Sequence, residues 1–148
     1  MFKPSRILVP TDMSDHSFKA IRQAFDVAQQ YGSEIYILHV IRNPIQECAF
    51  DYCISSDLAK QSQAEMNESI RKGVQLKLDS LPSLDTAKTT TDIKIGNPPD
   101  QILKEADERN IDLIVIAPLG SSGLAKFMVG SVARHVLLGA KCPVLLSR

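Results

Sequence analysis

The chain has 148 residues, of which 44% are hydrophobic, which suits one globular domain with a substantial core and is too short for two ordinary domains. Lysine plus arginine and aspartate plus glutamate each number 17, so no net field attracts nucleic acid or an anionic membrane, and we expect neither partner. We expect a cytoplasmic protein, because no apolar run is long enough to span a bilayer and the apolar segment near residue 1 is too short for a secretory signal. The three cysteines are too few for a disulfide scaffold, which fits a reducing compartment.

Short runs rich in apolar or β-branched residues predict five strands of a sheet, and the third of them alternates along its length. In chain order these runs are residues 6–10, 34–40, 89–95, 112–117 and 143–147. The run at 112–117 gives the strongest of these predictions. Pro143 stands at the first position of the last strand, where its missing N–H is tolerated.

Apolar residues spaced three or four apart predict helices between these strands. Ser14 or Asp15 can cap the first helix, which Gly32 ends. Further helices are expected at about residues 57–81, from the Gly-Asn-Pro-Pro sequence at 96–99 to Asn110, and at about residues 130–139. Residues 41–56 contain Pro44 and no clear period, and they predict a loop.

Strands that alternate with helices imply a parallel sheet joined by right-handed crossovers. The predicted fold class is therefore α/β, with a doubly wound parallel sheet. Ligands of such sheets bind outside the carboxyl ends of the strands, at the point where the strand order reverses. We therefore expect a site near residues 10–12, Val40 and the loop after Ala117.

The stretch 117–135, APLGSSGLAKFMVGSVARH, combines a glycine-containing loop with the start of a predicted helix. Gly120 and Gly130 are separated by nine residues, and Ser131 follows at the helix N-terminus. Unpaired N–H groups and a partial positive charge there favour phosphate oxygens, and glycine permits close approach of the backbone. The same residues would also form an ordinary turn and helix cap, so the residues alone leave both interpretations open.

This spacing resembles the motif of the universal stress protein family. Nucleotide-binding members carry Gly-x2-Gly-x9-Gly-Ser/Thr, and the corresponding positions here are Ala117, Gly120, Gly130 and Ser131. Other segments that resemble the family are ILVPTD at 7–12, GNP at 96–98, DLIVI at 112–116 and CPVL at 142–145. The resemblance implies one Rossmann-like domain over residues 1–148, with a five-stranded parallel sheet of strand order 3-2-1-4-5.

The resemblance also implies a function: a small ATP-binding stress-response protein that acts as a nucleotide-dependent dimeric switch or adaptor. We expect Mg²⁺ to accompany ATP, a homodimer to form through the C-terminal strand, and an unknown protein to be the partner. The family's adenine and ribose positions match Pro10, Asp12 and Val40, and its phosphate positions match Gly120, Gly130, Ser131 and Val132. Thr11 and Ala117 complete the expected ATP-binding set.

The sequence departs from the family motif at Ala117-Pro118-Leu119, the expected ribose end. Ala117 adds a methyl group, Pro118 lacks an N–H and restricts Ala117 to an extended conformation, and the Leu119 side chain cannot hydrogen-bond. A nucleotide-free interaction module of the same family is therefore the alternative function. Because no dedicated general base stands beside the phosphate site, we expect at most slow ATP hydrolysis.

Three other residue types have competing interpretations. Cys48 and Cys53 have four residues between them and no histidine nearby, so incidental thiols are favoured over a zinc site. His39 lies in an apolar strand, which favours a packed core histidine over a ligand. Asp12 suits a turn or helix cap and a binding role equally well.

Overall fold

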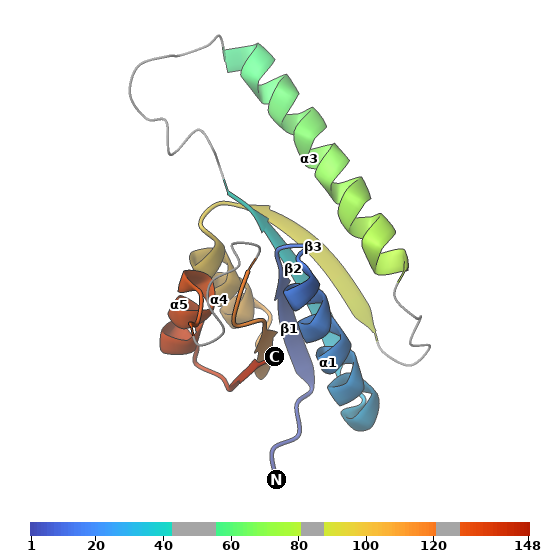
Figure 1. The fold of residues 1–148 in the computed structure, drawn as a ribbon, viewed down its shortest axis with the longest axis vertical. Helices are drawn as coiled ribbons and strands as arrows, with labels where there is room; N and C mark the ends of the chain where they lie inside the picture. Colours follow the sequence, from blue (N-terminus) through green and yellow to red (C-terminus); the bar gives the residue numbers. More distant parts are fainter. Residues whose placement is uncertain (43–55, 81–87, 121–127) are drawn as a thin grey trace. The chain divides into compact units, whose positions relative to one another are not determined.

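The computed structural model describes residues 1–42, 56–80, 88–120 and 128–148 (Figure 1). The chain divides into two compact units, one formed by residues 1–42 with 84–148 and the other by residues 43–83. The first unit carries the sheet. The second contains helix α3, a 24-residue helix at Ser56–Asp79.

The sheet has five strands, and every pairing between neighbours is parallel. The strands are β1 (Arg6–Thr11), β2 (Glu34–Ile41), β3 (Thr89–Ile95), β4 (Leu113–Ile116) and β5 (Val144–Leu146). Their order across the sheet is β3-β2-β1-β4-β5. The predicted doubly wound α/β fold and its strand order are therefore confirmed.

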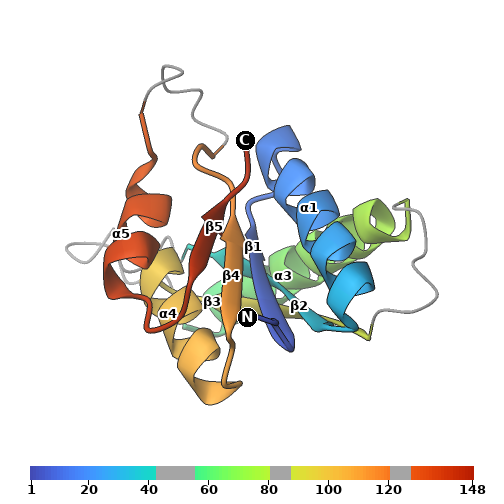
Figure 2. The same ribbon diagram turned by 90° about the horizontal axis from the view of Figure 1, so that it is seen from below.

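Helices cover both faces of this sheet. Helix α1 (Asp15–Tyr31) packs on β1, β2 and β4 from one face. Helices α4 (Pro98–Glu108) and α5 (Ser131–Gly139) lie on the opposite face (Figure 2). Because the chain first moves from β1 to β2 and later returns to β4 on the other side of β1, the strand order reverses between β1 and β4.

Strand β1 is buried on both faces, which explains its uninterrupted apolar sequence. Leu8 belongs to a cluster that includes Ile102 of α4 and Val136 of α5. Side chains alternate along a strand, so Ile7 and Val9 point to the α1 face, where they are fully buried. Burying each of these side chains stabilises the fold by about 1.5–3 kcal/mol.

Helix α1 begins and ends at residues whose chemistry caps a helix. Ser14 is its N-cap, and the Ser14 side chain accepts a hydrogen bond of 3.2 Å from the Ser17 N–H. Gly32 follows the last turn with φ 72°, a left-handed conformation that suits glycine. The Gly32 N–H donates to the Ala28 carbonyl at 2.7 Å. Of the two N-cap candidates, the structure selects Ser14.

Helix α4 is held on the sheet by a nearly buried carboxylate. Glu105 is 4% exposed, and its side chain pairs with Lys94 of β3 at 3.5 Å and with Arg109. Glu105, and then Asp92, raise the pKa of Lys94 above its usual value. The Arg109 guanidinium also lies 4.9 Å from the centre of the Tyr36 ring. These contacts fix α4 against β2 and β3.

The observed element ends differ slightly from the predicted ones. Helix α5 begins at Ser131 because Gly130 is its N-cap. Strand β4 is shorter at both ends than the run at 112–117, and β5 covers Val144–Leu146 only. Pro82, the expected end of the long helix, lies outside the described residues.

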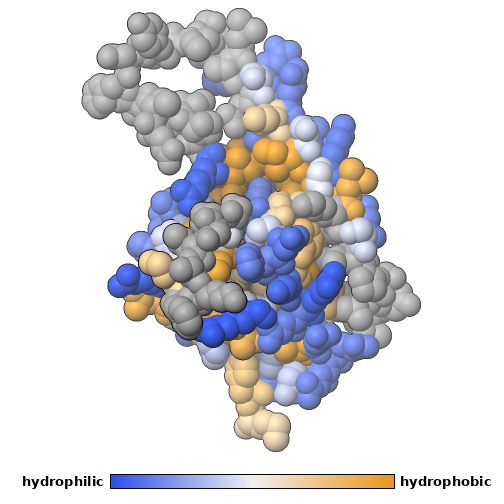
Figure 3. All heavy atoms as spheres, in the orientation of Figure 1, coloured by the Kyte–Doolittle hydropathy of each residue, from blue (hydrophilic) through white to orange (hydrophobic). Residues whose placement is uncertain are grey.

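The surface mixes polar and apolar side chains, and hydrophilic residues are spread over much of the face drawn in Figure 3. Among the described residues with large exposed apolar side chains, Leu138 of α5 is 80% exposed. In the described parts of the chain, every helix is too short or too polar to span a bilayer.

The start of β4 is tied to the N-terminal segment through Asp112. Its carboxylate accepts hydrogen bonds from the Ser5 N–H at 2.9 Å and the Arg6 N–H at 3.0 Å, and also from the Ser5 hydroxyl. Partial burial by itself would raise the pKa of Asp112, but the hydrogen bonds from Ser5 and Arg6 together lower it below its usual value. The ionised carboxylate therefore stabilises the junction of β1 and β4.

We predict that Asp112→Asn lowers the free energy of unfolding at pH 7 by about 1–2 kcal/mol, because charge-assisted bonds are lost. A lowered folded-state pKa contributes stability above about pH 4 that disappears as the pH falls through that pKa. The difference between the two proteins in urea denaturation should therefore shrink as the pH falls from 7 to 3. Asp26→Asn, at an exposed position of α1, is the control. An Asp112→Asn deficit of equal size at both pH values would contradict the prediction.

Candidate functional site

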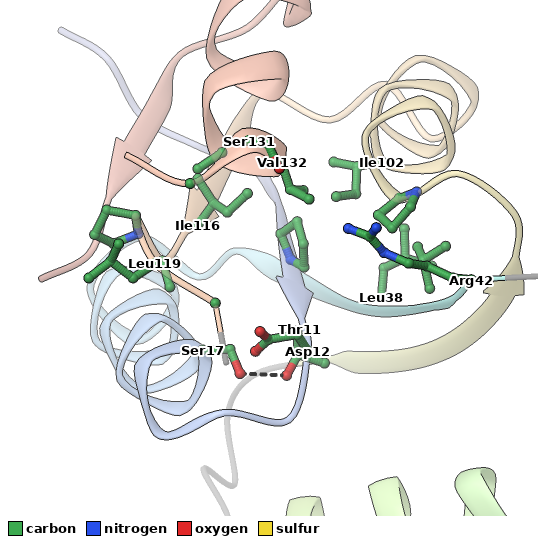
Figure 4. Close-up of a pocket in the computed structure, with 18 residues that line it drawn as sticks. Thr11, Asp12, Ser17, Leu38, Arg42, Ile102, Ile116, Leu119, Ser131 and Val132 are labelled. Carbon is green, nitrogen blue, oxygen red and sulfur yellow. Dashed lines mark hydrogen bonds between the residues drawn. The ribbon is translucent and has the colours of Figure 1, made fainter. Parts of the chain in front are cut away.

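A pocket of about 340 Å³ lies at the carboxyl ends of β1, β2 and β4, where the strand order reverses (Figure 4). The position is the one expected for a ligand site in a doubly wound sheet, and the size lies at the lower end of the range for small-molecule sites. All nine residues that the sequence predicts as the binding set line it: Pro10, Thr11, Asp12, Val40, Ala117, Gly120, Gly130, Ser131 and Val132.

The turn between β1 and α1 forms one side of the pocket. Met13 has φ 68°, a left-handed conformation that costs a non-glycine residue of order 1 kcal/mol or more. The two side chains before Met13 hold this turn, since the Met13 N–H donates to Thr11 Oγ1 at 3.2 Å and the Ser14 N–H donates to Asp12 Oδ1 at 3.0 Å. The turn therefore presents Thr11 and Asp12 at the end of the strand.

Asp12 lies directly against Gly120. A Cβ atom placed on Gly120 would come within 2.8 Å of Asp12 Oδ2, closer than real Cβ contacts. Glycine at this position therefore allows the loop after β4 to pass beside the carboxylate. Asp12 thus serves as a turn residue and also lines the pocket, so the two sequence interpretations of Asp12 are compatible.

The N-terminus of α5 is joined to the end of β4 through Pro118. The Gly130 N–H donates to the Pro118 carbonyl at 2.7 Å. A Cβ atom on Gly130 would lie 3.2 Å from that same oxygen, which is tighter than most such contacts. Pro118 lacks an N–H, but its carbonyl closes the loop and brings the two ends of the motif together.

Helix α5 begins in a way that leaves its first N–H groups available to a ligand. Gly130 is the N-cap and has no side chain, and the described first turn contains no acidic residue. Ser131 is exposed at the first helical position. The orphan N–H groups and the positive end of the helix dipole favour an anion at this position. Helix α1, by contrast, has its N-terminus closed by Ser14.

The opposite end of the pocket is lined mainly by apolar side chains, with Arg42 beside them. The Gly96 N–H donates to the Ile41 carbonyl at 2.9 Å, so the chain after β3 turns beside the end of β2. This turn places Pro98 and Ile102 of α4 against Val40 in the pocket wall. A flat, apolar group could bind at this end by packing against these side chains.

Sequence reasoning missed several lining residues, of which Arg42 is the most informative. The sequence pattern could have indicated Arg42, because residues 38, 40 and 42 share one face of an extended chain and Val40 was among the predicted site residues. Arg42 escaped notice because it stands beyond the predicted end of the strand. The other lining residues outside the predicted binding set are Ser17, Leu38, Pro98, Ile102, Ile116, Pro118, Leu119 and Ala133.

His39 does not lie in the pocket and is only half-buried, so the predicted core histidine is a partly exposed one. Its Nδ1 atom is 2.8 Å from the Thr11 carbonyl oxygen. Thr11 is itself buried, and its hydroxyl lies 2.9 Å from that of Ser17 at the start of α1. These contacts hold the last residue of β1 in place beside the pocket.

No preformed metal centre is found within the described ranges, where no three His, Cys, Asp or Glu side chains gather at a metal-binding distance. Cys48 and Cys53 lie outside those ranges. Cys142 is a free thiol whose pKa is raised by burial. Asp12 is the single carboxylate among the described residues that line the pocket.

A sequence profile of the universal stress protein family matches residues 3–148. The chain belongs to this family. The universal stress protein YxiE of Bacillus subtilis is 32% identical, over 97% of this chain and 99% of that protein.

Solved structures of the family have the same fold. The universal stress protein UspA from Lactobacillus plantarum has a TM-score of 0.72 at 25% identity, with full coverage of both chains. The universal stress protein from Archaeoglobus fulgidus, solved in complex with dAMP, has a TM-score of 0.56 at 25% identity and covers 99% of this chain and 98% of its own.

The contact between Gly120 and Asp12 in this universal stress protein predicts energetic coupling. We expect Gly120→Ala to cost more stability in the natural chain than in an Asp12→Ala background, because the added methyl group displaces the carboxylate only when it is present. The coupling energy should be about 0.5–1.5 kcal/mol in a double-mutant cycle measured by urea denaturation. The cycle cancels the entropic gain of replacing glycine. Additive effects of the two changes would show that the contact is absent.

Proposed function

We propose that this chain is a cytoplasmic, single-domain universal stress protein that binds ATP in the pocket at the carboxyl ends of β1, β2 and β4. In this proposal the bound nucleotide alters a homodimer or a surface read by a protein partner, so that the protein acts as a switch or adaptor. The observation that carries it is the division of one pocket into an anion-receiving end at α5 and an apolar end at β2 and α4.

This division matches the two chemical parts of a nucleotide. Phosphate oxygens would accept hydrogen bonds from the first N–H groups of α5 and from the Ser131 hydroxyl. The base would lie against Val40, Pro98 and Ile102. The dAMP complex of the Archaeoglobus fulgidus relative supports a nucleotide as the class of ligand.

Mg²⁺ would arrive with the triphosphate rather than occupy a site of its own. The described residues around the pocket offer one carboxylate, Asp12, and Mg²⁺ typically uses one or two carboxylates together with phosphate oxygens and water. The Asp12 Oδ1 atom accepts bonds from the Ser14 N–H and hydroxyl, which hold the carboxylate beside the pocket. The ion would offset charge between the carboxylate and the phosphates.

The alternative function is a nucleotide-free interaction module, and the observation that favours it is at the end of β4. Ala117 is 9% exposed, and Pro118 and Leu119 line the pocket where the family motif has a glycine and two variable residues. A buried methyl group and a missing N–H weaken this side of the pocket for a ribose. The phosphate end at Gly130 and Ser131 does not share this change.

The homodimer is proposed through β5, which is an edge strand in the described sheet. An edge strand leaves unpaired backbone groups that a second copy can satisfy. The side chains of Val144, Leu145 and Leu146 are only half-buried. Leu138, at the nearby end of α5, is largely exposed.

Calorimetry with ATP and Mg²⁺ tests the nucleotide proposal. We predict that the natural chain binds, and that Gly130→Val abolishes binding because its side chain blocks approach to the helix N-terminus. Replacing Ala117 with Gly and Pro118 with Ser should tighten binding about tenfold or more, by removing a methyl group and restoring an N–H. The control is Gly73→Val in α3, where a Cβ meets no atom within 4 Å.

The same calorimetry can also support the alternative, a nucleotide-free interaction module. If the natural chain binds no ATP and the Ala117→Gly, Pro118→Ser variant does, the site has decayed at these two residues and the interaction-module function holds. Thermal unfolding of each variant without nucleotide separates a blocked pocket from a protein that has lost its fold.

Sedimentation tests the dimer. We predict a dimer at micromolar concentration and a monomer for Val144→Asp, because a buried charge at the paired edge is strongly unfavourable. Thr90→Asp places the same charge on β3, the other edge of the described sheet, and should leave the dimer intact. A monomeric natural chain, or a folded Val144→Asp variant that still dimerises, would exclude β5 as the interface.

A further inference from the structure

Arg42 is a charged side chain at the apolar end of the pocket. It follows β2 directly and lies on the same side of the extended chain as Leu38 and Val40, so it lines the pocket with them. In Figure 4 its guanidinium extends from the end of β2 into the pocket, beside the apolar side chains of that end. The residue is exposed to solvent overall, so its guanidinium can be reached by a ligand that enters the pocket.

Two other arginines of this chain have partners of a kind that Arg42 lacks. Arg6 pairs with Glu34 at 3.8 Å, and Arg109 pairs with Glu105 and lies over the Tyr36 ring. In the part of the chain that the structure describes, no carboxylate is paired with Arg42 and no aromatic ring lies beneath it. With no such partner among the described residues, its guanidinium can contact a ligand in the pocket.

The position of Arg42 separates it from the anion-receiving end. Ser131, at the start of α5, lies on the other side of the pocket in Figure 4. A nucleotide whose phosphates contact Gly130 and Ser131 would extend its base toward Val40 and Pro98, where Arg42 is. The guanidinium would therefore meet the base, while the phosphates remain at α5.

We propose that Arg42 stacks its guanidinium on the face of a purine base and is a base-binding residue of this pocket. This inference rests on the proposed nucleotide-binding function. A guanidinium is planar, delocalised and weakly hydrated, and it packs on the negative face of an aromatic ring. Arg109 over Tyr36 is the same arrangement within this chain. Val40, Pro98 and Ile102 supply the apolar surface on which the base rests.

The experiment compares the Kd values of AMP and ATP for the natural chain, Arg42→Ala and Arg42→Lys. Arg42→Ala should weaken both nucleotides by the same factor, about 5- to 30-fold, because a base contact does not depend on the number of phosphates. Arg42→Lys keeps the charge but not the flat group, and it should weaken both by at least about 3-fold. Arg22→Ala, at an exposed position of α1 away from the pocket, should change neither.

Each other outcome overturns the inference in a recognisable way. A loss that grows from AMP to ATP would place Arg42 on the phosphates. Unchanged affinity in folded Arg42→Ala would show that it contacts no part of the ligand. If Arg42→Ala does not fold, Arg42→Lys decides, since affinity equal to that of the natural chain would exclude stacking. A natural chain that binds neither nucleotide would instead refute the proposed function itself.

Discussion

The parallel pairing of β1 with β2 on one side and β4 on the other determines where the site lies. Thr11 is opposite His39 and Leu8 is opposite Ile114, so the carboxyl ends of all three strands lie on the same side of the sheet. Because the strand order reverses at β1, the connections after β1 and β4 diverge to opposite faces. The pocket lies between these two diverging connections, and the buried apolar residues of β1 fix the strand beside it.

The two ends of this pocket differ because the helices that border it begin differently. Helix α5 begins after Gly130, which has no side chain to satisfy the first N–H groups. Helix α4 begins with Pro98, which has no N–H and presents an apolar ring to the pocket. One helix therefore supplies hydrogen-bond donors and the other an apolar wall. This difference is the physical basis of the proposed nucleotide site.

Local patterns were sufficient to predict most of the fold. The apolar run of β1, the Ser14 cap and Gly32 identify their elements because each acts through its own backbone or its immediate neighbours. Strand order depends on contacts between distant segments, and it came from the family resemblance rather than from periodicity.

The same distinction explains the site. The nine predicted residues share one pocket because the motif and the strand ends mark them, whereas Arg42 carries no motif and stands after the predicted strand end. The bond from Gly130 to the Pro118 carbonyl likewise joins residues twelve positions apart and has no signal in the sequence. Contacts made across loops are therefore what the structure adds.

The most direct test of the account is a ¹H–¹⁵N correlation spectrum of the natural chain titrated with ATP and Mg²⁺. If the pocket binds nucleotide, the amide signals of Val40, Gly120, Gly130 and Ser131 shift together and saturate, while those of Gly32 and Asn110, remote from the pocket, stay in place. Shifts confined to residues outside the pocket, or a spectrum unchanged at millimolar ATP, would contradict the assignment of this pocket as a nucleotide site.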